Sequence, residues 1–305
     1  MKALRMHSTI MIFLDGIGIG ESDKEKNPFF RKEFKTFSRI FGSTPHLNNQ
    51  FLNAGNRFLF PTDACLDVEG LPQSGTGQTS IFCGFNAPKA YGRHFGPFSP
   101  SDLIPRLKEE NIFAEMKKRG LKADFVNAYP KIFFDYINSG KQRLSVTSLS
   151  CLLSGVKLNK AAQLRAGRAL SAEIDNFRWV NKLNYKLPVI SPELAAQRLY
   201  RIGLKNHYTL FEFFLSDHLG HGRIPESFEH IYDTLDRFLY FILSNIPDKC
   251  TVIICSDHGN FEDISTKMHT RNPSLTISAG ENAKYFADNV ENISQIKKAI
   301  LGLYD

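Results

Sequence analysis

Cysteine is scarce in this sequence, and the cysteines that are present form no recognisable pairs. There are five, an odd number, and no two of them have a CxxC spacing. This pattern argues against a disulfide framework and against a cysteine-ligated zinc site. A reducing compartment fits it best, so we expect a cytoplasmic protein. The five are Cys65, Cys83, Cys151, Cys250 and Cys255.

Long apolar runs and repeats are missing as well. The first apolar stretch, Ile10 to Leu14, ends at Asp15 and is too short for a signal peptide or a membrane span. We therefore expect a soluble protein without membrane contact. With 305 residues, 42% of them hydrophobic and 23% charged, the chain is long enough to bury one large core or two smaller ones.

A concentrated basic segment, as found in many nucleic-acid-binding proteins, is also absent. The formal net charge is +7, but the basic residues are spread along the chain. A generally positive surface also suits a small anionic substrate, which is the partner that we expect in place of nucleic acid. The oligomeric state cannot be inferred from the sequence.

Three apolar segments share one pattern, in which a buried run ends at an acidic residue. "TIMIFLDG" leads to Asp15, "YTLFEFFLSD" to Asp217, and "CTVIICSDHG" to Asp257 and His258. Near-continuous apolar runs that are rich in β-branched and aromatic residues are typical of strands buried on both faces of a parallel sheet. We therefore predict three such strands.

Helical patterns lie between these strands. In "SPELAAQRLYRIG", Ser191 is the expected N-cap, Pro192 the first helical residue and Gly203 the stop signal. Alternating strands and helices predict an α/β fold, with a doubly wound, mainly parallel sheet and helices on both faces. Ligands in such folds bind at the carboxyl ends of the strands, where the three aspartates are expected to meet.

The stretch 131–187 breaks this alternation and carries the single tryptophan, Trp179. We predict that it is a small inserted cap over the active edge of the sheet. The core would then consist of residues 1–130 and 188–305.

The candidate functional residues are carboxylates and imidazoles. Asp217 and His221 form a D-x-x-x-H pattern, Asp257 and His258 are adjacent, and His269 follows in "MHTRNP". Such a set, together with Asp15, matches the ligands that a pair of divalent cations requires. Taken singly, each motif is more often a turn that contains a hydrogen-bonded or solvent-exposed histidine, and only the motifs together, in this order, indicate a metal site.

The segment "LPQSGTGQTSIFCG" predicts a tight loop that opens a helix, where free backbone N–H groups hold a phosphate. Ser74, Thr76 and Thr79 are the candidate nucleophiles. An ordinary Ser/Thr-rich helix cap is the alternative, although a hydroxyl beside a divalent cation is readily activated.

The ordered motifs "FLDGIG", "SGTGQTSIFCG", "SDHLGH", "SDHGN" and "MHTRNP" resemble the metal-binding core of the alkaline phosphatase superfamily. Within that superfamily they are similar to the branch of cofactor-independent phosphoglycerate mutases and phosphopentomutases. The resemblance covers roughly residues 8 to 130 and 190 to 285.

The resemblance implies two divalent metal ions, manganese or zinc, with magnesium as a further possibility. It assigns Asp217, His221 and His269 to one ion. To the other it assigns Asp15, Asp257, His258 and Ser74, which is also the implied nucleophile that becomes phosphorylated. The implied reaction is two-metal phosphoryl transfer through a phosphoserine.

The sequence departs from the mutases in two respects. Gln78 stands where both mutase families have histidine, and the inserted segment is much shorter than their substrate-holding domain. A mutase must shelter its intermediate from water, whereas a phosphatase need not, so the short cap favours hydrolysis of a small phosphomonoester. A phosphoglycerate- or phosphosugar-type mutase, a sulfate or phosphonate ester hydrolase, and a non-catalytic anion-binding metalloprotein remain alternatives.

Basic residues for gripping the phosphate are expected in "APKAYGRHFGPF". Lys89, Arg93 and His94 follow the nucleophile segment closely. A basic surface turn would explain the same residues.

Overall fold

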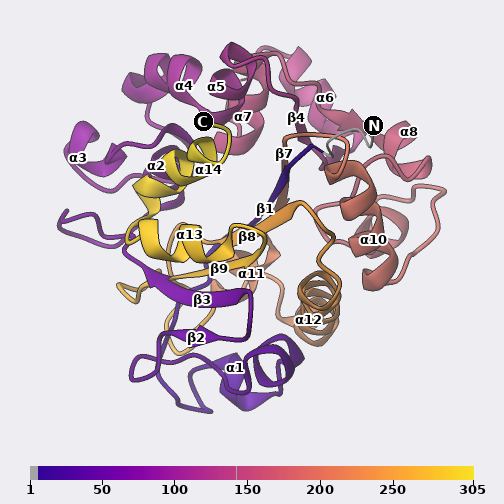
Figure 1. The fold of residues 1–305 in the computed structure, drawn as a ribbon. Coiled ribbons are helices and arrows are strands. Elements are labelled where there is room, and N and C mark those ends of the chain that lie inside the picture. Colours follow the sequence, from indigo (N-terminus) through magenta and orange to yellow (C-terminus); the bar gives the residue numbers. More distant parts are fainter. Residues whose placement is uncertain (1–5, 142) are drawn as a thin grey trace, which may run out of the picture.

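The computed structural model describes residues 6–141 and 143–305 and is built on a seven-stranded sheet of order β2-β3-β9-β8-β1-β7-β4 (Figure 1). At its centre, β1 (Ser8–Leu14) pairs in parallel with β7 (Tyr208–Phe213) and with β8 (Cys250–Cys255). The sheet is completed by β2 (Leu52–Asn53), β3 (Arg57–Thr62), β4 (Ala123–Phe125) and β9 (Ser274–Gly280), which runs antiparallel to β8 and β3. The predicted α/β class with a mainly parallel sheet is confirmed.

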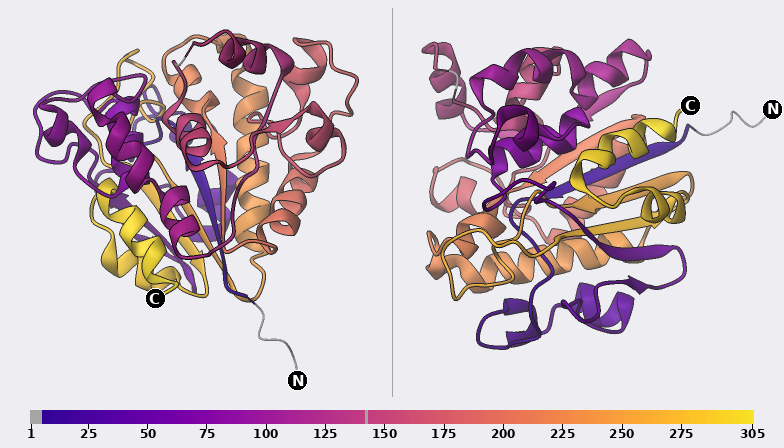
Figure 2. Two further views of the ribbon diagram at one scale, coloured as in Figure 1. Left: turned by 90° about the horizontal axis from the view of Figure 1, so that it is seen from above. Right: turned by 90° about the vertical axis from the view of Figure 1, so that its left-hand side faces the viewer.

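Both faces of the sheet carry helices, because alternate residues of β1 enter different cores. Ile10 and Ile12 lie in the core beneath α1 (Pro28–Arg31), α10 (Pro192–Gly203) and α12 (Phe228–Ser244). Met11 and Phe13 lie in the opposite core, which includes α2 (Ser74–Cys83) and α14 (Ile296–Gly302). The left view of Figure 2 shows the sheet between these two layers. This arrangement leaves the ends of the strands open for a site.

The remaining helices are short. Those of the core are α3 (Ala87–Tyr91), α4 (Ile104–Glu110), α5 (Ile112–Lys118), α11 (Leu215–Gly220) and α13 (Ala283–Asn289), with a π-helical stretch at Thr36–Phe41. Single 3-10 turns occur at Ser101–Leu103, Pro225–Ser227 and Ile293–Gln295. No helix within the described residues combines the length and the apolar character needed to cross a bilayer.

Helix α10 begins as predicted, but its last residue serves a different purpose. Ser191 accepts a hydrogen bond from the amide of Leu194, and Pro192 opens the helix. Gly203 was predicted as a stop signal, yet it is still helical. A Cβ atom there would lie 2.4 Å from Cδ1 of Ile10, so glycine is needed because the helix packs closely on β1.

The segment predicted as a cap consists of four short helices and one small strand. They are α6 (Lys131–Asn138), α7 (Val146–Ser154), α8 (Ala161–Arg165), α9 (Phe177–Asn181) and β6 (Asn159–Lys160), which pairs with β5 (Ala128–Tyr129). Val146 and Cys151 of α7 are fully buried in the core on the α2 side. Part of this segment is therefore packed into the core, and the domain boundaries stay a prediction.

Candidate active site

The candidate site lies where β1, β7 and β8 end. Asp15 follows β1 directly, and Asp257 and His258 follow β8. Asp217 was predicted at the end of a strand, but β7 stops at Phe213 and Asp217 lies in helix α11. The hydroxyl of Ser216 donates a 2.6 Å hydrogen bond to the carbonyl of Asp15, which fixes this short helix against the end of β1.

One cluster of donors consists of Asp217, His221 and His269, as the resemblance implied. Oδ1 of Asp217 lies 3.2 Å from Nε2 of His221 and 3.6 Å from Nε2 of His269. The two Nε2 atoms are 3.2 Å apart. Three potential ligand atoms therefore converge on one point.

Backbone carbonyls determine which ring nitrogens are free for coordination. Nδ1 of His221 donates to the carbonyl of Lys267, and Nδ1 of His269 donates to that of Pro72, each at 2.6 Å. In the neutral rings both Nε2 atoms then carry lone pairs that face each other and the Asp217 carboxylate. Lone pairs in this arrangement repel unless a proton or a metal ion lies between them, so the residues fit a divalent cation.

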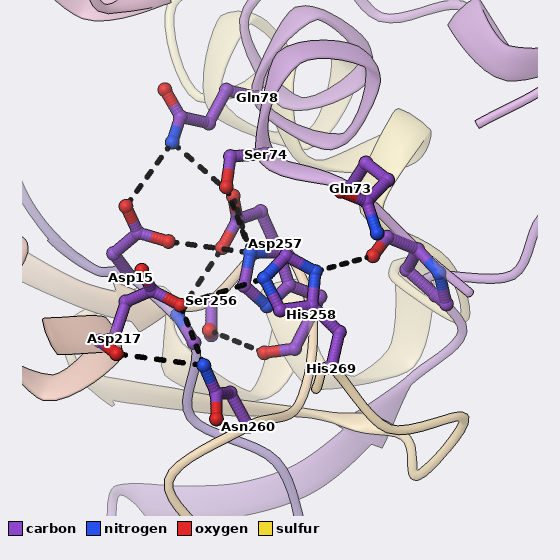
Figure 3. A network of polar contacts seen from close by, with 12 residues as sticks. Asp15, Gln73, Ser74, Gln78, Asp217, Ser256, Asp257, His258, Asn260 and His269 are labelled. Atoms are coloured by element: carbon purple, nitrogen blue, oxygen red, sulfur yellow. Dashed lines mark hydrogen bonds and ion pairs between the residues drawn. The ribbon is translucent and has the colours of Figure 1, made fainter. Parts of the chain in front are cut away.

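A second cluster forms around His258, which is fully buried. Its Nε2 lies 3.0 Å from Oγ of Ser74, 3.4 Å from Oδ1 of Asp15 and 3.6 Å from Oδ2 of Asp257 (Figure 3). Asp217 also lies within reach of this cluster, so its carboxylate stands between the two groups of ligands.

Asp15 shows most clearly that the residues of this second cluster suit a cation. Its Oδ1 atom is buried and has no hydrogen-bond partner among the described residues. Burial, together with the nearby carboxylates of Asp257 and Asp217, raises the pKa of Asp15 well above its usual value. A divalent cation would relieve this repulsion and keep the carboxylates ionised.

Asp217 experiences the opposite electrostatic environment. Burial alone would raise its pKa, but hydrogen bonds from His221 and His269 lower it below the usual range. The hydrogen bond with Asp217 correspondingly raises the pKa of His221. A proton on His221 therefore occupies the position that a cation would take.

Of the three candidate hydroxyls, that of Ser74 contacts the cluster around His258. Ser74 is the first residue of α2, and its Oγ atom points to His258 (Figure 3). The other two candidates are engaged elsewhere: the hydroxyl of Thr76 accepts from the amide of Phe95, and that of Thr79 donates to the carbonyl of Gly75. The geometry thus separates Ser74 from both threonines.

Gln78 takes the place of the mutase histidine with a neutral amide. Its Nε2 donates to Oδ2 of Asp257 at 3.2 Å and lies 3.5 Å from Oδ2 of Asp15. It is almost fully buried, so it brings a hydrogen-bond donor between two carboxylates without a titratable ring.

The segment that follows β8 is held by two residues that the sequence analysis missed. Asn260 donates a 2.7 Å hydrogen bond to Oδ1 of Asp217. Glu262, also buried, accepts from the amides of Gly18 and Asn260 and from the hydroxyl of Thr270. For Asn260, the only signal in the sequence that it belongs to the site is its position directly after "SDHG".

A further carboxylate, Glu212, was missed inside the strand β7. It is the only charged residue in the run "YTLFEFF", which is the signal that could have revealed it. Thr147 donates a 2.9 Å hydrogen bond to it, but burial prevails and raises its pKa to about 7. It lines a cavity that also reaches Ser74 and Asp15.

The basic residues that line the site are not those expected from the sequence. Lys89 and Arg93 are exposed, and Nε2 of His94 donates a 3.3 Å hydrogen bond to the carbonyl of Val68. None of the three lines the two cavities that reach Ser74, so their role in substrate binding stays a prediction. Arg223 lines both cavities and lies 3.9 Å from Oδ2 of Asp217.

Comparison with known proteins agrees with the fold and with the sequence motifs. Residues 193–303 match the model of the metalloenzyme superfamily, a range that contains both D-H motifs and His269. The fold is similar to that of an alkaline phosphatase from the Antarctic bacterium TAB5, with a TM-score of 0.54 and 14% identity over 98% of each chain. The protein has an alkaline phosphatase-like fold and a metalloenzyme-superfamily sequence in its C-terminal part. The predicted relationship to this superfamily is thereby confirmed, whereas the mutase branch is not singled out.

Two further solved structures have a similar fold. A cold-active alkaline phosphatase from a psychrophilic Shewanella species has a TM-score of 0.52 and 11% identity, covering 97% of this chain and 99% of its own. The PH0037 protein from Pyrococcus horikoshii has a TM-score of 0.54 and 12% identity, covering 92% of this chain and 88% of its own. No curated protein sequence matches the chain.

Proposed function

We propose that the protein is a two-metal phosphomonoesterase that uses Ser74 as its nucleophile. The observation that carries this proposal is the position of the Ser74 hydroxyl, which lies 3.0 Å from Nε2 of His258 at the start of α2. The hydroxyl oxygen and the imidazole nitrogen are as close together as two ligands of one metal ion would be. Bound manganese or zinc ions would activate the hydroxyl and stabilise the charge that develops on the phosphoryl group.

The chain's own groups have separate tasks in this reaction. Asp15, Ser74, Asp257 and His258 would hold one ion, and Asp217, His221 and His269 the other. The oxygen of Ser74 loses its proton to solvent and attacks phosphorus, while the bond between phosphorus and the alcohol oxygen breaks and that oxygen takes up a proton. Water then attacks the phosphoserine, which releases inorganic phosphate and restores Ser74.

Two features favour transfer to water over a mutase reaction. Ser74 is reached by two cavities, of about 310 and 290 Å³. Arg223, which lines both, is more than half exposed. Water therefore has access to the phosphoserine, and Arg223 is placed to contact the phosphate oxygens. We place the enzyme in the cytoplasm, with a small phosphorylated molecule as its substrate.

The nucleophile can be tested by trapping the intermediate. Enzyme loaded with manganese or zinc is quenched during turnover of a phosphomonoester, and the phosphorylated residue is located by mass spectrometry. We expect phosphate on Ser74, and Ser74→Ala should abolish this adduct and lower kcat by at least about a thousandfold. Thr76→Ser is the matched control, because it keeps the hydroxyl that holds Phe95. A phosphate adduct on residue 76 or 79, or full activity of Ser74→Ala, would refute the assignment.

A further inference from the structure

The larger of the two cavities at Ser74 has walls of an unusual kind. It is lined by Asp15, Ser74 and Asp217 among others, and its volume of about 310 Å³ is at the lower end of the range for small-molecule sites. Five aromatic side chains are among the remaining lining residues. They are Phe98, Tyr129, Phe133, Tyr136 and Phe214.

All five of these rings are only partly buried, so apolar surface faces the cavity. Helix α6 supplies Phe133 and Tyr136 from one helical face, and none of its side chains is fully buried. Leaving aromatic surface in contact with water is unfavourable by about 25 cal/mol per Å². A ligand with apolar faces would cover this surface.

The wall formed by Tyr129 is fixed in place before any ligand binds. Its hydroxyl lies 2.7 Å from that of Ser148, which in turn lies 2.9 Å from that of Ser145. Its ring stacks on Phe133, with centroids 3.9 Å apart and an angle of 19° between the planes. A rigid aromatic surface binds a flat partner without a large loss of side-chain entropy.

The smaller cavity on the other side of Ser74 has a different chemistry. It is lined by polar groups, among them Gln73, His221, Lys267 and His269, and by two long apolar side chains, those of Leu71 and Met268. The two cavities therefore offer a choice between an aromatic and a polar environment for the alcohol part of a substrate.

We propose that the substrate is a phosphomonoester whose alcohol carries a planar aromatic ring, bound in the cavity lined by Phe133 and Tyr136. This inference rests on the proposed phosphomonoesterase activity. The ring lies against the aromatic wall while the phosphate reaches Ser74. Arg223 and Arg143, which also line this cavity, supply positive charge near the phosphate.

The test uses two esters that differ in the flatness of the ring. Benzyl phosphate and cyclohexylmethyl phosphate are both esters of primary alcohols, so their leaving groups have similar reactivity. We expect the metal-loaded enzyme to hydrolyse benzyl phosphate with a kcat/KM about three- to tenfold higher. Isothermal titration with the matching phosphonates, benzylphosphonate and cyclohexylmethylphosphonate, should show the same preference in binding without any turnover.

Substitutions then locate the ring. Phe133→Leu keeps the side chain apolar but removes its flat face. It should bring the ratio of the two kcat/KM values, and the ratio of the two phosphonate affinities, close to one. Ile132→Ala, on the same helix but 70% exposed and outside the cavity, should leave both ratios unchanged. Lys267→Ala, in the polar cavity, should also leave the preference for the aromatic compound intact.

The outcomes separate this inference from the proposed function. If both esters are hydrolysed and no preference is seen in rate or in binding, the phosphomonoesterase stands and the aromatic site is refuted. A preference that disappears in Lys267→Ala, but not in Phe133→Leu, overturns the choice of cavity. If neither ester is hydrolysed but the phosphonates bind with the expected preference, the catalytic proposal fails and the aromatic site is upheld.

Discussion

Single residues in this site carry charges and lone pairs that a metal ion or a proton stabilises. Asp15 has a buried oxygen without a hydrogen-bond partner, and the Nε2 atoms of His221 and His269 face each other at 3.2 Å. Without a metal ion, protons on Asp15 and His221 relieve the electrostatic repulsion among these groups, as the raised pKa values of both residues indicate. Protons and metal ions therefore compete for the same positions, and metal affinity should fall as the pH is lowered.

Metal content should respond differently to substitution of two ligands. His269 belongs to one cluster, so His269→Ala should remove about one equivalent of metal from the loaded protein and leave the other. Asp217 lies between both clusters, so Asp217→Ala should lower the occupancy of both. Elemental analysis after resupply of metal measures these losses. Equal losses in the two variants would contradict the intermediate position of Asp217.

Glu212 should give the metal-free protein a measurable dependence of stability on pH. Its pKa is about 7 in the folded state, against 4.5 for an ordinary glutamate. Between these values the unfolded chain has released the proton and the folded protein has kept it. The free energy of unfolding therefore decreases as the pH rises from about 4.5 to about 7 and stays lowered above that.

The variant Glu212→Gln lacks this titration but can still accept the hydrogen bond from Thr147. Relative to the wild type, it should gain up to roughly 2 kcal/mol of stability between pH 5 and pH 8. Urea unfolding in the presence of a chelator measures the difference, with Glu226→Gln on the surface as the control. An identical pH profile for Glu212→Gln and wild type would show that Glu212 is ionised in the folded protein.

At the level of elements, the position of Ser74 depends on how closely helix α2 approaches the loop before α4. A Cβ atom on Gly75 would lie 2.0 Å from the carbonyl oxygen of Phe98 and 2.6 Å from that of Phe95. Both are backbone atoms, so neither can move without displacing the loop. The loop and the first turn of α2 are therefore fitted to each other through this glycine.

Gly75→Ala should accordingly damage both activity and stability. We expect a loss of about 1 to 3 kcal/mol in the free energy of unfolding, as for other overpacked sites, and a large fall in kcat because Ser74 is displaced. Gly302→Ala in α14 is a suitable control, because the added Cβ would meet only the flexible end of Tyr285. Urea unfolding and phosphatase assays measure the two effects. A fully active Gly75→Ala would mean that the loop adjusts freely.

For the molecule as a whole, the site joins distant parts of the chain, so bound metal should stabilise the entire fold. Saturating manganese or zinc at a hundred times the dissociation constant would add about 2.7 kcal/mol for each independent site. We expect a clear rise in Tm when metal is restored to chelator-treated protein, and a smaller rise in His269→Ala. Differential scanning fluorimetry measures both. A Tm that metal leaves unchanged in the wild type would argue against a preformed site.

The sequence predicts those parts of the site that follow a strand or open a helix. Asp15, Asp257 and His258 stand directly after buried apolar runs, and strand ends meet at one edge of a sheet, so their proximity followed from the pattern. Arg223, Asn260 and Tyr129 could not be found in this way, because loop and cap packing decides what their side chains contact. Two arginines illustrate this. Arg93 is nearer to Ser74 in the sequence, but it is Arg223 that lines the cavities.

The order of strands in the sheet also governs how the protein can be synthesised. The first strand, β1, has β7 and β8 as its neighbours, and these begin at Tyr208 and Cys250. On the ribosome, the apolar residues from Ile10 to Leu14 therefore cannot pair with β7 and β8 until most of the chain has been translated. Nascent chains of this protein should depend on chaperones that shield apolar segments, and should become competent to bind metal only shortly before release.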